Sequence, residues 1–581
     1  MGMKYPFIFM ITETGVKQMN EDLIPDTLEL ADRAELAIHH ITTNVDRKLH
    51  NTPYFYLHMN GDPPACVHEP WDWGDVTGRY LDALVSLRQI TGTRTGIDIE
   101  HSLKDLLVST LDKTNGLTYR MKTPWSNDEA GMFDQGRALG AFLSLYMATQ
   151  SRKYLDHAKR MIDGLWNIAI HVERKDKGYT YCYYPYSTYL REAWDSKETA
   201  EPTCYGGGST ILPVVKFYEI TGSPKAKELA ERFINFIVLE SGVFDAQGSF
   251  LPPDMIPDRP HFHSKSLSFL GVLKYAVLEK RKDLIEWCRK AYNWAYAQGT
   301  SFGWFPEGVG AINHEPTPWS ETCSTTDMIE TAILLAQNGY PEYWNHVERF
   351  ARNYLMEAQV VDVEWIRERE NVKKRDTKRA CFKNAAEMML GGFVGRCLPH
   401  DLIADGFQMA CCCGAGARGL YQVWDHAMQF DKGSLYVNLL LNKRAPYAEV
   451  ESHLPCEGTV IIKIHRACSL YVRIPDWVSS DSIMMFYDRE NIHSRVKHEY
   501  LYIPCLKPGD DITMKFPVDI EARKETIQKW RFDILWKGDT IIKISPCGDK
   551  VPLYQRDFMN AYQVPYRPKP EIPKRRNTVH W

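Results

Sequence analysis

The sequence lacks three features that would each place it in a familiar class of protein. No apolar run approaches the ~18 residues that a membrane-spanning helix needs. Charge of one sign is not in excess, because 70 lysines and arginines stand against 74 aspartates and glutamates, a formal net charge of −4. Such a chain has no global field that attracts phosphate backbones, so we do not expect a nucleic-acid partner. The first residues show no basic region followed by a long apolar stretch, and we therefore expect a cytoplasmic protein.

The cysteines fit neither a disulfide framework nor a zinc-finger spacing. There are 14 in 581 residues, and three of them are consecutive, Cys411 to Cys413. Neighbouring side chains rarely satisfy disulfide geometry, so thiol or metal chemistry is the better interpretation. The chain is 44% hydrophobic and 25% charged, which is the composition of a globular protein.

The sequence does contain a repeat. A small residue followed by an apolar helical run occurs near residues 78, 136, 207, 264, 325 and 414. Between these runs lie amphipathic patterns such as SPKAKELAERFINFIVLE, whose apolar residues recur every three or four positions. Alternation of largely apolar and amphipathic helices predicts an (α/α)6 barrel, with the repeat helices packed around one axis. A linear helical solenoid is the alternative.

A change of period marks a second domain. From about residue 432 the apolar residues alternate, as in SLYVNLLLN, GTVIIKIH and SLYVRIPDW, with Gly, Pro or Asp between the segments. The predicted fold class is therefore α+β and multidomain. An (α/α)6 barrel over residues 1–430 precedes a jelly-roll-like β-sandwich over 431–553 and a basic, Pro-rich tail over 554–581.

In such a barrel, the residues before each repeat helix meet at one mouth. Aromatic rings and carboxylates dominate there, and both are typical of carbohydrate pockets. We therefore expect a carbohydrate partner. The candidate sugar contacts are Asp72, Trp73, Gln135, Tyr205 and His263. Asp72 could instead cap the first repeat helix, and a tryptophan here could belong to the core.

The strongest chemical signal is Glu321-Thr322-Cys323 together with Cys411-Cys412. A Cys/Glu pair from one segment and two thiolates from another could hold a four-coordinate Zn²⁺. Buried thiols beside a salt-bridged glutamate are the alternative.

The segments PWSETC (318–323), CCCGAGARGLY, LYVRIPDW and LKPGDDITMKFP resemble those of glycoside hydrolase family 127, the β-L-arabinofuranosidase group. The resemblance implies a barrel followed by a β-sandwich, and a retaining mechanism with a zinc-bound cysteine nucleophile. Its zinc ligands fall on Glu321, Cys323, Cys411 and Cys412, with Cys411 as the nucleophile. A slipped match to Cys412 and Cys413 stays open. The acid/base of the family best matches Glu315, and Glu307 is the other candidate.

The resemblance does not fix the sugar. His263 matches one sugar-contacting histidine of the family, whereas Gln135 and Tyr205 stand where others are placed. We expect a glycosidase that releases a terminal β-L-arabinofuranose or a related residue. The alternatives are a metal-free uronyl hydrolase, lyase or sugar epimerase on the same barrel, and a non-catalytic glycan-binding protein. A homodimer is compatible with the sequence.

Overall fold

The computed structural model describes residues 23–186, 188–191, 208–251, 260–309, 316–371, 373–404, 406–561 and 563–568. They form two compact units, which we call the helical unit and the sheet unit. The helical unit comprises Leu30–His426 and Ile520–Arg556, and the sheet unit is built mainly from Ala427–Asp519. The division falls near the predicted boundary at residue 430, but residues 520–553 belong to the helical unit, and residues 23–29 and 557–568 belong to the sheet unit.

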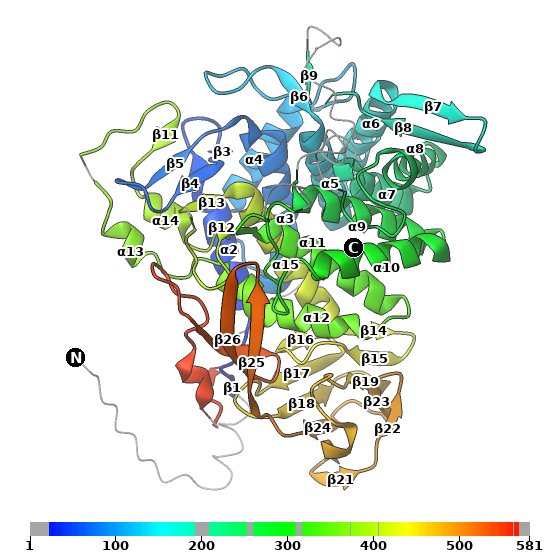
Figure 1. Cartoon of the computed structure of the whole chain (residues 1–581), viewed down its shortest axis with the longest axis vertical. Coiled ribbons are helices and arrows are strands. Elements are labelled where there is room, and N and C mark those ends of the chain that lie inside the picture. Colours follow the sequence, from blue (N-terminus) through cyan, green and yellow to red (C-terminus); the bar gives the residue numbers. More distant parts are fainter. Residues whose placement is uncertain are drawn as a thin grey trace. The chain divides into compact units, whose positions relative to one another are not determined.

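A ring of inner helices forms the centre of the helical unit (Figure 1). They are α3 (Gly74–Thr91), α5 (Met132–Thr149), α7 (Ser209–Thr221), α9 (Phe262–Leu278), α11 (Thr322–Gln337) and α15 (Ala410–Ala427). From α3 to α11 each contacts the next. The ring closes because Thr326 on α11 donates a hydrogen bond to the Ala415 carbonyl on α15 at 3.0 Å, and Gly414 on α15 lies against Arg79 on α3. The described helices therefore form the closed ring that the repeat predicts, and not a linear solenoid.

Amphipathic outer helices surround this ring. They are α2 (Leu30–Thr43), α4 (Ile97–Thr110), α6 (Arg152–Ile168), α8 (Pro224–Asn235), α10 (Lys282–Tyr296) and α12 (Tyr343–Phe350), and each packs on an inner helix. On α8 the buried residues Ala226, Leu229, Ala230, Phe233 and Ile234 recur at helical spacing and form one apolar stripe. By contrast, α9 is buried on all sides from Phe262 to Leu273. Burial on one side or on all sides thus distinguishes the two layers.

Glycine allows the inner helices to approach closely. A Cβ at Gly78 of α3 would lie 2.7 Å from the carbonyl carbon of Arg137 on α5. A Cβ at Gly136 would lie 2.5 Å from the Ser209 carbonyl oxygen on α7. Both separations are shorter than a van der Waals contact, so the backbone spacing of the ring requires glycine at these positions.

Short strands lead into two of the inner helices. β10 (Ser320–Glu321) pairs with β12 (Gly395–Cys397) and runs directly into α11. β13 (Phe407–Met409) precedes α15 and ends the sheet β11-β5-β4-β13. The other strands of that sheet are β11 (Ala380–Cys381), β5 (Ala65–Val67) and β4 (Tyr56–His58). Pairing at both places fixes where each helix begins.

A three-stranded sheet of β25 (Ile520–Ile527), β26 (Trp530–Lys537) and β27 (Thr540–Ser545) completes the helical unit. The backbone amide and hydroxyl of Ser301 donate to the Glu525 carboxylate at 2.8 and 2.7 Å. Arg349 donates to Asp539 at 2.8 Å, and the Asn353 amide donates to the Asp539 carbonyl. These polar contacts join the sheet to the helices, which is why it does not belong to the sheet unit.

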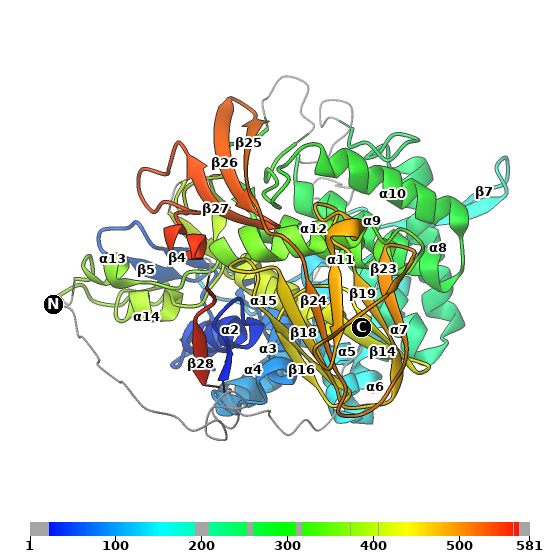
Figure 2. The same ribbon diagram turned by 90° about the horizontal axis from the view of Figure 1, so that it is seen from below.

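The sheet unit has two sheets around one apolar core. The first has the order β14-β15-β19-β23-β22 and the second β16-β17-β18-β24-β20-β21. Figure 2 labels β14, β19 and β23 of the first sheet and β16, β18 and β24 of the second. The strands of the first are β14 (Met428–Asp431), β15 (Ser434–Val437), β19 (Cys468–Arg473), β23 (Tyr500–Leu506) and β22 (Arg495–Lys497). Those of the second are β16 (Lys443–Ala445), β17 (Ala448–Ser452), β18 (Thr459–Ile464), β24 (Asp511–Lys515), β20 (Met484–Tyr487) and β21 (Glu490–Ile492). Alternate residues of both sheets, such as Leu470 and Ile462, share the core. A jelly-roll connectivity stays a prediction.

Two strands from opposite ends of the described chain also pair in the sheet unit. β1 (Leu23–Pro25) is antiparallel to β28 (Tyr566–Pro568), so part of the predicted tail is a strand.

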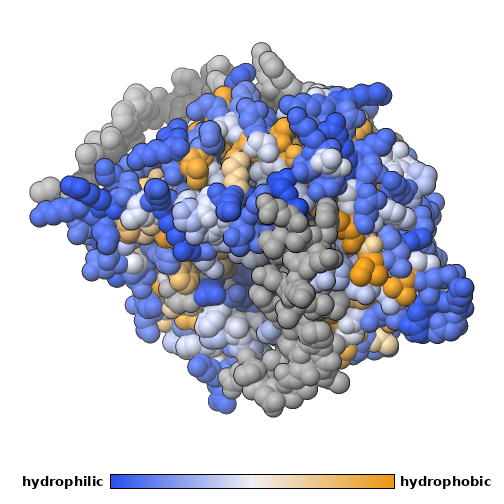
Figure 3. Space-filling model, turned by 90° about the horizontal axis from the view of Figure 1, so that it is seen from above, coloured by the Kyte–Doolittle hydropathy of each residue, from blue (hydrophilic) through white to orange (hydrophobic). Residues whose placement is uncertain are grey.

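None of the described helices has both the length and the apolar character that crossing a membrane requires. On the face seen in Figure 3, hydrophilic side chains predominate and apolar ones are scattered among them.

Candidate functional site

Four buried side chains from two helix starts converge in the helical unit. Glu321 directly precedes α11, Cys323 is in its first turn, and Cys411 and Cys412 are in the first turn of α15. One ligand atom from each of these residues lies within 4.8 Å of every other. Almost 90 residues separate the pair Glu321 and Cys323 from the pair Cys411 and Cys412 in the sequence, and closure of the ring brings the two pairs together. We call this set the thiol cluster.

The thiol cluster has the dimensions of a metal site. The sulfur atoms of Cys323 and Cys412 are 3.8 Å apart, and all described cysteines are free thiols. A disulfide would need about 2.05 Å. Two sulfurs bound to one tetrahedral zinc ion at about 2.3 Å each would be about 3.8 Å apart. The donor set of three sulfurs and one carboxylate oxygen could therefore hold a metal ion.

Cys413 does not join the cluster. Its thiol donates to the Phe393 carbonyl at 3.3 Å, because the third residue of the cysteine run points to a different side of α15. Among the described residues, the group that could hold a metal uses Cys411 and Cys412, not the slipped pair Cys412 and Cys413.

The cluster favours a negative charge on Cys411. Hydrogen bonds from the thiols of Cys323 and Cys412 lower the pKa of Cys411 to about 6, whereas burial raises the pKa of Cys323 to about 12. Arg79 lies beside them, with Nη1 3.7 Å from the Cys323 sulfur and 3.4 Å from the Cys411 carbonyl oxygen. The neighbouring thiols and Arg79 thus favour ionisation of Cys411 over ionisation of Cys323.

His261 supports the carboxylate of the cluster. Its Nε2 lies 2.9 Å from Glu321 Oε2, and its Nδ1 lies 2.6 Å from the Ser264 hydroxyl. Burial lowers the pKa of His261, but the Glu321 carboxylate outweighs it and the net shift is upward. A ligating carboxylate held by a hydrogen-bond donor is usual around protein metal sites.

Glu307 is a second carboxyl group close to the cluster. Trp319 Nε1 donates to its Oε2 at 2.5 Å, and Arg396 Nε lies 3.4 Å from the same oxygen. Burial, and then the negative charge of Glu321, raise the pKa of Glu307. A raised pKa suits a carboxyl group to general-acid chemistry. Glu315, the other candidate acid/base, lies outside the described residues.

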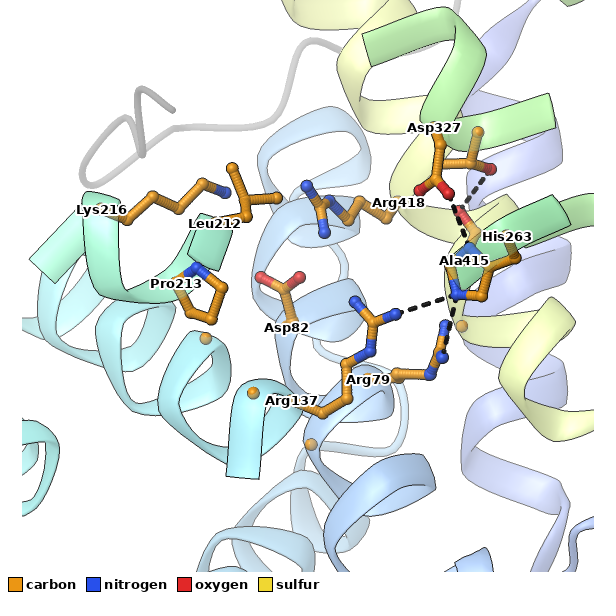
Figure 4. Close-up of a pocket in the computed structure, with 15 residues that line it drawn as sticks. Arg79, Asp82, Arg137, Leu212, Pro213, Lys216, His263, Asp327, Ala415 and Arg418 are labelled. Carbon is orange, nitrogen blue, oxygen red and sulfur yellow. Dashed lines mark hydrogen bonds and ion pairs between the residues drawn. The ribbon is translucent and has the colours of Figure 1, made fainter. Parts of the chain in front are cut away.

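Next to the cluster, inside the ring, is a cavity of about 40 Å³ that we call the cationic chamber (Figure 4). Its charged lining residues are Arg79, Asp82, Arg137, Lys216, Asp327 and Arg418. In Figure 4 the head groups of Arg79, Arg137, Lys216 and Arg418 point toward a common space from α3, α5, α7 and α15. Arg79 belongs to both features, because its guanidinium also reaches the thiol cluster.

His263, a predicted sugar contact, lines this chamber. Its Nδ1 is 2.6 Å from Asp327 Oδ2, and its Nε2 faces Arg137 Nη2 at 3.0 Å and Arg79 Nη2 at 3.4 Å. Burial, together with the nearby arginines, lowers the pKa of His263 well below its usual value. Two guanidinium groups face Nε2 and a carboxylate faces Nδ1, so this arrangement favours a neutral imidazole that accepts at Nε2 and donates from Nδ1.

The other predicted sugar contacts lie elsewhere. Gln135 is fully buried, and its amide bonds the backbone of Thr118 and Gly131, which leaves a structural role. Asp72 accepts from the Glu69 amide and contacts His68, so it caps the short helix Pro70–Asp72. Trp73 is 1% exposed and belongs to the core. None of these three lines the chamber. Tyr205 lies outside the described residues.

The sequence interpretation gave no role to Arg79 or Arg137 of the chamber. Arg79 and Arg137 each follow a glycine at the start of a repeat helix, and Arg418 lies in the first turns of another. A charged residue inside an otherwise apolar helix was the available signal, since such a residue is seldom buried without a partner.

Comparisons with known proteins find similar folds among solved structures. No family model matches the chain, and no curated protein matches its sequence. The structure is similar to a GH127 β-L-arabinofuranosidase from Geobacillus stearothermophilus T6, with TM-score 0.58 and 16% identity, over 90% of this chain and 82% of that one. It is also similar to a second GH127 β-arabinofuranosidase, with TM-score 0.59 and 15% identity, over 88% and 80% of the two chains. A further glycoside hydrolase has TM-score 0.57 and 15% identity over 81% and 77%.

Proposed function

We propose that this chain, which has the fold of family 127 glycoside hydrolases, is a retaining glycoside hydrolase with Cys411 as its nucleophile. It releases a terminal sugar, β-L-arabinofuranose or a related residue, from a glycan. The observation that carries this proposal is the convergence of Glu321, Cys323, Cys411 and Cys412 within 4.8 Å. The alternative, buried thiols beside a salt-bridged glutamate, gives no reason for three sulfurs and a carboxylate to meet at one point.

Zinc fits this donor set better than a harder cation, because three of the four ligands are thiols. It would be held by all four residues of the thiol cluster, and when bound it keeps thiols deprotonated. Side chains of the protein itself also stabilise this negative charge on sulfur. Arg79 and the neighbouring thiols stabilise a thiolate on Cys411, and His261 orients the Glu321 carboxylate.

The proposed reaction consists of two displacements at the anomeric carbon. In the first, the Cys411 sulfur bonds the anomeric carbon while the bond to the leaving oxygen breaks, and Glu307 gives that oxygen its proton. In the second, water attacks the same carbon, the Glu307 carboxylate accepts a proton from it, and the carbon–sulfur bond breaks. Two inversions give net retention. Glu307 takes the acid/base role here because partial burial and the charge of Glu321 raise its pKa, which favours the protonated form that a general acid needs.

The test is hydrolysis of 4-nitrophenyl β-L-arabinofuranoside and a panel of related aryl furanosides and pyranosides, alongside zinc analysis of the purified chain. We expect about one zinc per chain and turnover that ends when the metal is stripped. Full turnover by zinc-free protein would contradict the proposal and favour carboxylate or histidine chemistry on the same barrel. Sugar binding with no glycoside cleaved would indicate a glycan-binding protein.

A further inference from the structure

Four cationic side chains line the cationic chamber, against two carboxylates, Asp82 and Asp327. Arg79 and Arg137 both direct Nη2 at one nitrogen, Nε2 of His263, at 3.4 and 3.0 Å. Arg79 also donates to Asp75 and to the Cys411 carbonyl, so the donors that lack an acceptor are those of Arg137. The shared contact is visible in Figure 4.

The two carboxylates that line the chamber, Asp82 and Asp327, have other partners, and so do two carboxylates beyond its lining. Of the latter, Asp75 accepts from Arg79 at 2.6 Å, and one oxygen of Glu330 accepts from Arg418. Asp327 contacts His263 and Ser266, both at 2.6 Å. Asp82 accepts from the Ser144 hydroxyl. Each acid is thus held by a specific donor, and Arg137 has none of them within hydrogen-bond distance.

Arg137 is the residue with the clearest deficit. Its side chain is 10% exposed, its Nε makes no hydrogen bond among the described residues, and the nearest carboxylate oxygen, on Asp75, is 3.7 Å away. The guanidinium instead lies over the ring of Phe133, 5.1 Å from the centroid, where Arg79 also lies at 5.6 Å. Only Nη2 has an acceptor, on His263, and leaving the buried Nε–H unpaired is costly, so this geometry favours a ligand oxygen.

The chamber has room for such a group. Its volume of about 40 Å³ corresponds to about three water-sized groups, at ~10–15 Å³ each. That space suits a carboxylate but not a whole sugar ring. Gly140 adds to the opening, because a Cβ there would meet nothing within 4 Å.

We propose that the cationic chamber binds the anionic group of an acidic sugar, and that the substrate is a uronic-acid-type glycoside. Arg137 and Lys216 would hold its carboxylate in charge-assisted hydrogen bonds. Arg79 contacts His263 of the chamber and Cys323 of the thiol cluster, so the proposal places the sugar ring between its bound carboxylate and Cys411. In a pyranosyl uronate the carboxylate-bearing carbon and the anomeric carbon flank the ring oxygen, which fits this arrangement. The inference rests on the proposed function for the role of Cys411 and only on the chamber for binding.

Calorimetric titration of the full chain with matched monosaccharides tests the binding. The pairs are galacturonate against galactose and glucuronate against glucose, with inorganic sulfate as a separate titrant. We expect at least one uronate to bind at least tenfold more tightly than its neutral partner, and sulfate to bind more weakly than that uronate. Equal binding of the acidic and neutral sugars would overturn the proposal. Sulfate binding as tightly as the better uronate would also overturn it, because the chamber would then be a site for free anions.

Two variants test the residues. Arg137→Gln and Lys216→Met should each weaken uronate binding at least tenfold and leave galactose binding unchanged. Lys225→Met is the matched control, because Lys225 lies on the outer helix α8 in an exposed pair with Asp163. If Arg137→Gln fails to fold, Lys216→Met decides the question. Unchanged uronate binding in the folded variants would overturn the assignment.

The outcomes separate this inference from the proposed function. Tight uronate binding by the Cys411→Ala protein, without cleavage of any uronide by the native chain, would support the chamber and contradict the hydrolase. Cys411-dependent cleavage of a neutral arabinofuranoside with no preference for uronates would do the reverse.

Discussion

The sulfur atoms of Cys323 and Cys412 lie 3.8 Å apart, although the two residues are 89 positions apart in the chain. Each belongs to the first turn of an inner helix, and the two helices are neighbours because the ring closes between α11 and α15. A buried pair at this spacing has the geometry of two ligands of one tetrahedral ion. The cluster therefore leads to a direct prediction about metal content.

Cys323→Ala should abolish zinc binding, because it removes one of four ligands from a closed site. Elemental analysis of the variant should give less than about a tenth of the native zinc content. Cys288→Ala is the control, because Cys288 is equally buried on α10 and donates to the Phe269 carbonyl. It should keep the native zinc content. Equal zinc in Cys323→Ala and in the native protein would show that the thiol cluster is not the metal site.

Cys411→Ser should lower kcat at least about a thousandfold, or roughly 4 kcal/mol of activation free energy, because a serine hydroxyl is not ionised near neutral pH. Cys413→Ser should keep kcat within about tenfold, since the Cys413 thiol contacts the Phe393 carbonyl and not the cluster. Steady-state kinetics on the best aryl glycoside of the panel makes the comparison. A larger loss in Cys413→Ser than in Cys411→Ser would reverse the assignment of the nucleophile.

Glu307→Gln should change the pH profile as well as the rate. The native acid works only when protonated, so kcat/KM should fall as pH rises through the raised pKa of Glu307. Glutamine cannot ionise, and the alkaline fall should disappear while the rate drops by about 10² to 10⁴. The loss should be smaller for aryl leaving groups, which need less protonation.

The control for this variant is Glu364→Gln on the short helix Glu364–Arg367, where the side chain is 71% exposed. It should leave both the rate and the profile as in the native enzyme. An unchanged alkaline limb in Glu307→Gln would assign that limb to another group, and Glu315→Gln would then be the variant to compare.

The layers of the fold and the thiol cluster could be predicted because each has a local signature. An inner helix such as α9 is apolar on every side, and Glu321 and Cys323 stand together in one short motif. The chamber has no such signature. Arg79, Arg137 and Arg418 are each a single charge in an apolar helix, and only closure of the ring brings them together.

Two further features could not be predicted from the periodicity of the sequence, because they depend on how the elements pack. Strands β25–β27 show the same alternation as the strands of the sheet unit, and only contacts such as Ser301 with Glu525 assign them to the helical unit. The assignment of the acid/base likewise depends on which carboxyl group lies near Glu321. Sequence spacing favours Glu315, which lies outside the described residues, and among the described residues Glu307 is the carboxyl group whose pKa burial and the charge of Glu321 raise.

A pair of glycine substitutions tests the packing of the inner ring itself. Gly78→Ala should destabilise the protein by about 1–3 kcal/mol, because the new Cβ would lie 2.7 Å from the carbonyl carbon of Arg137 and α3 and α5 would have to separate. Gly140→Ala, on the same ring, should stabilise it by up to about 1 kcal/mol, since the methyl group meets nothing within 4 Å and alanine favours the helix. Urea denaturation of the zinc-loaded chains measures both changes. Equal stabilities for the two variants would mean that α3 and α5 do not approach as closely as the glycines indicate.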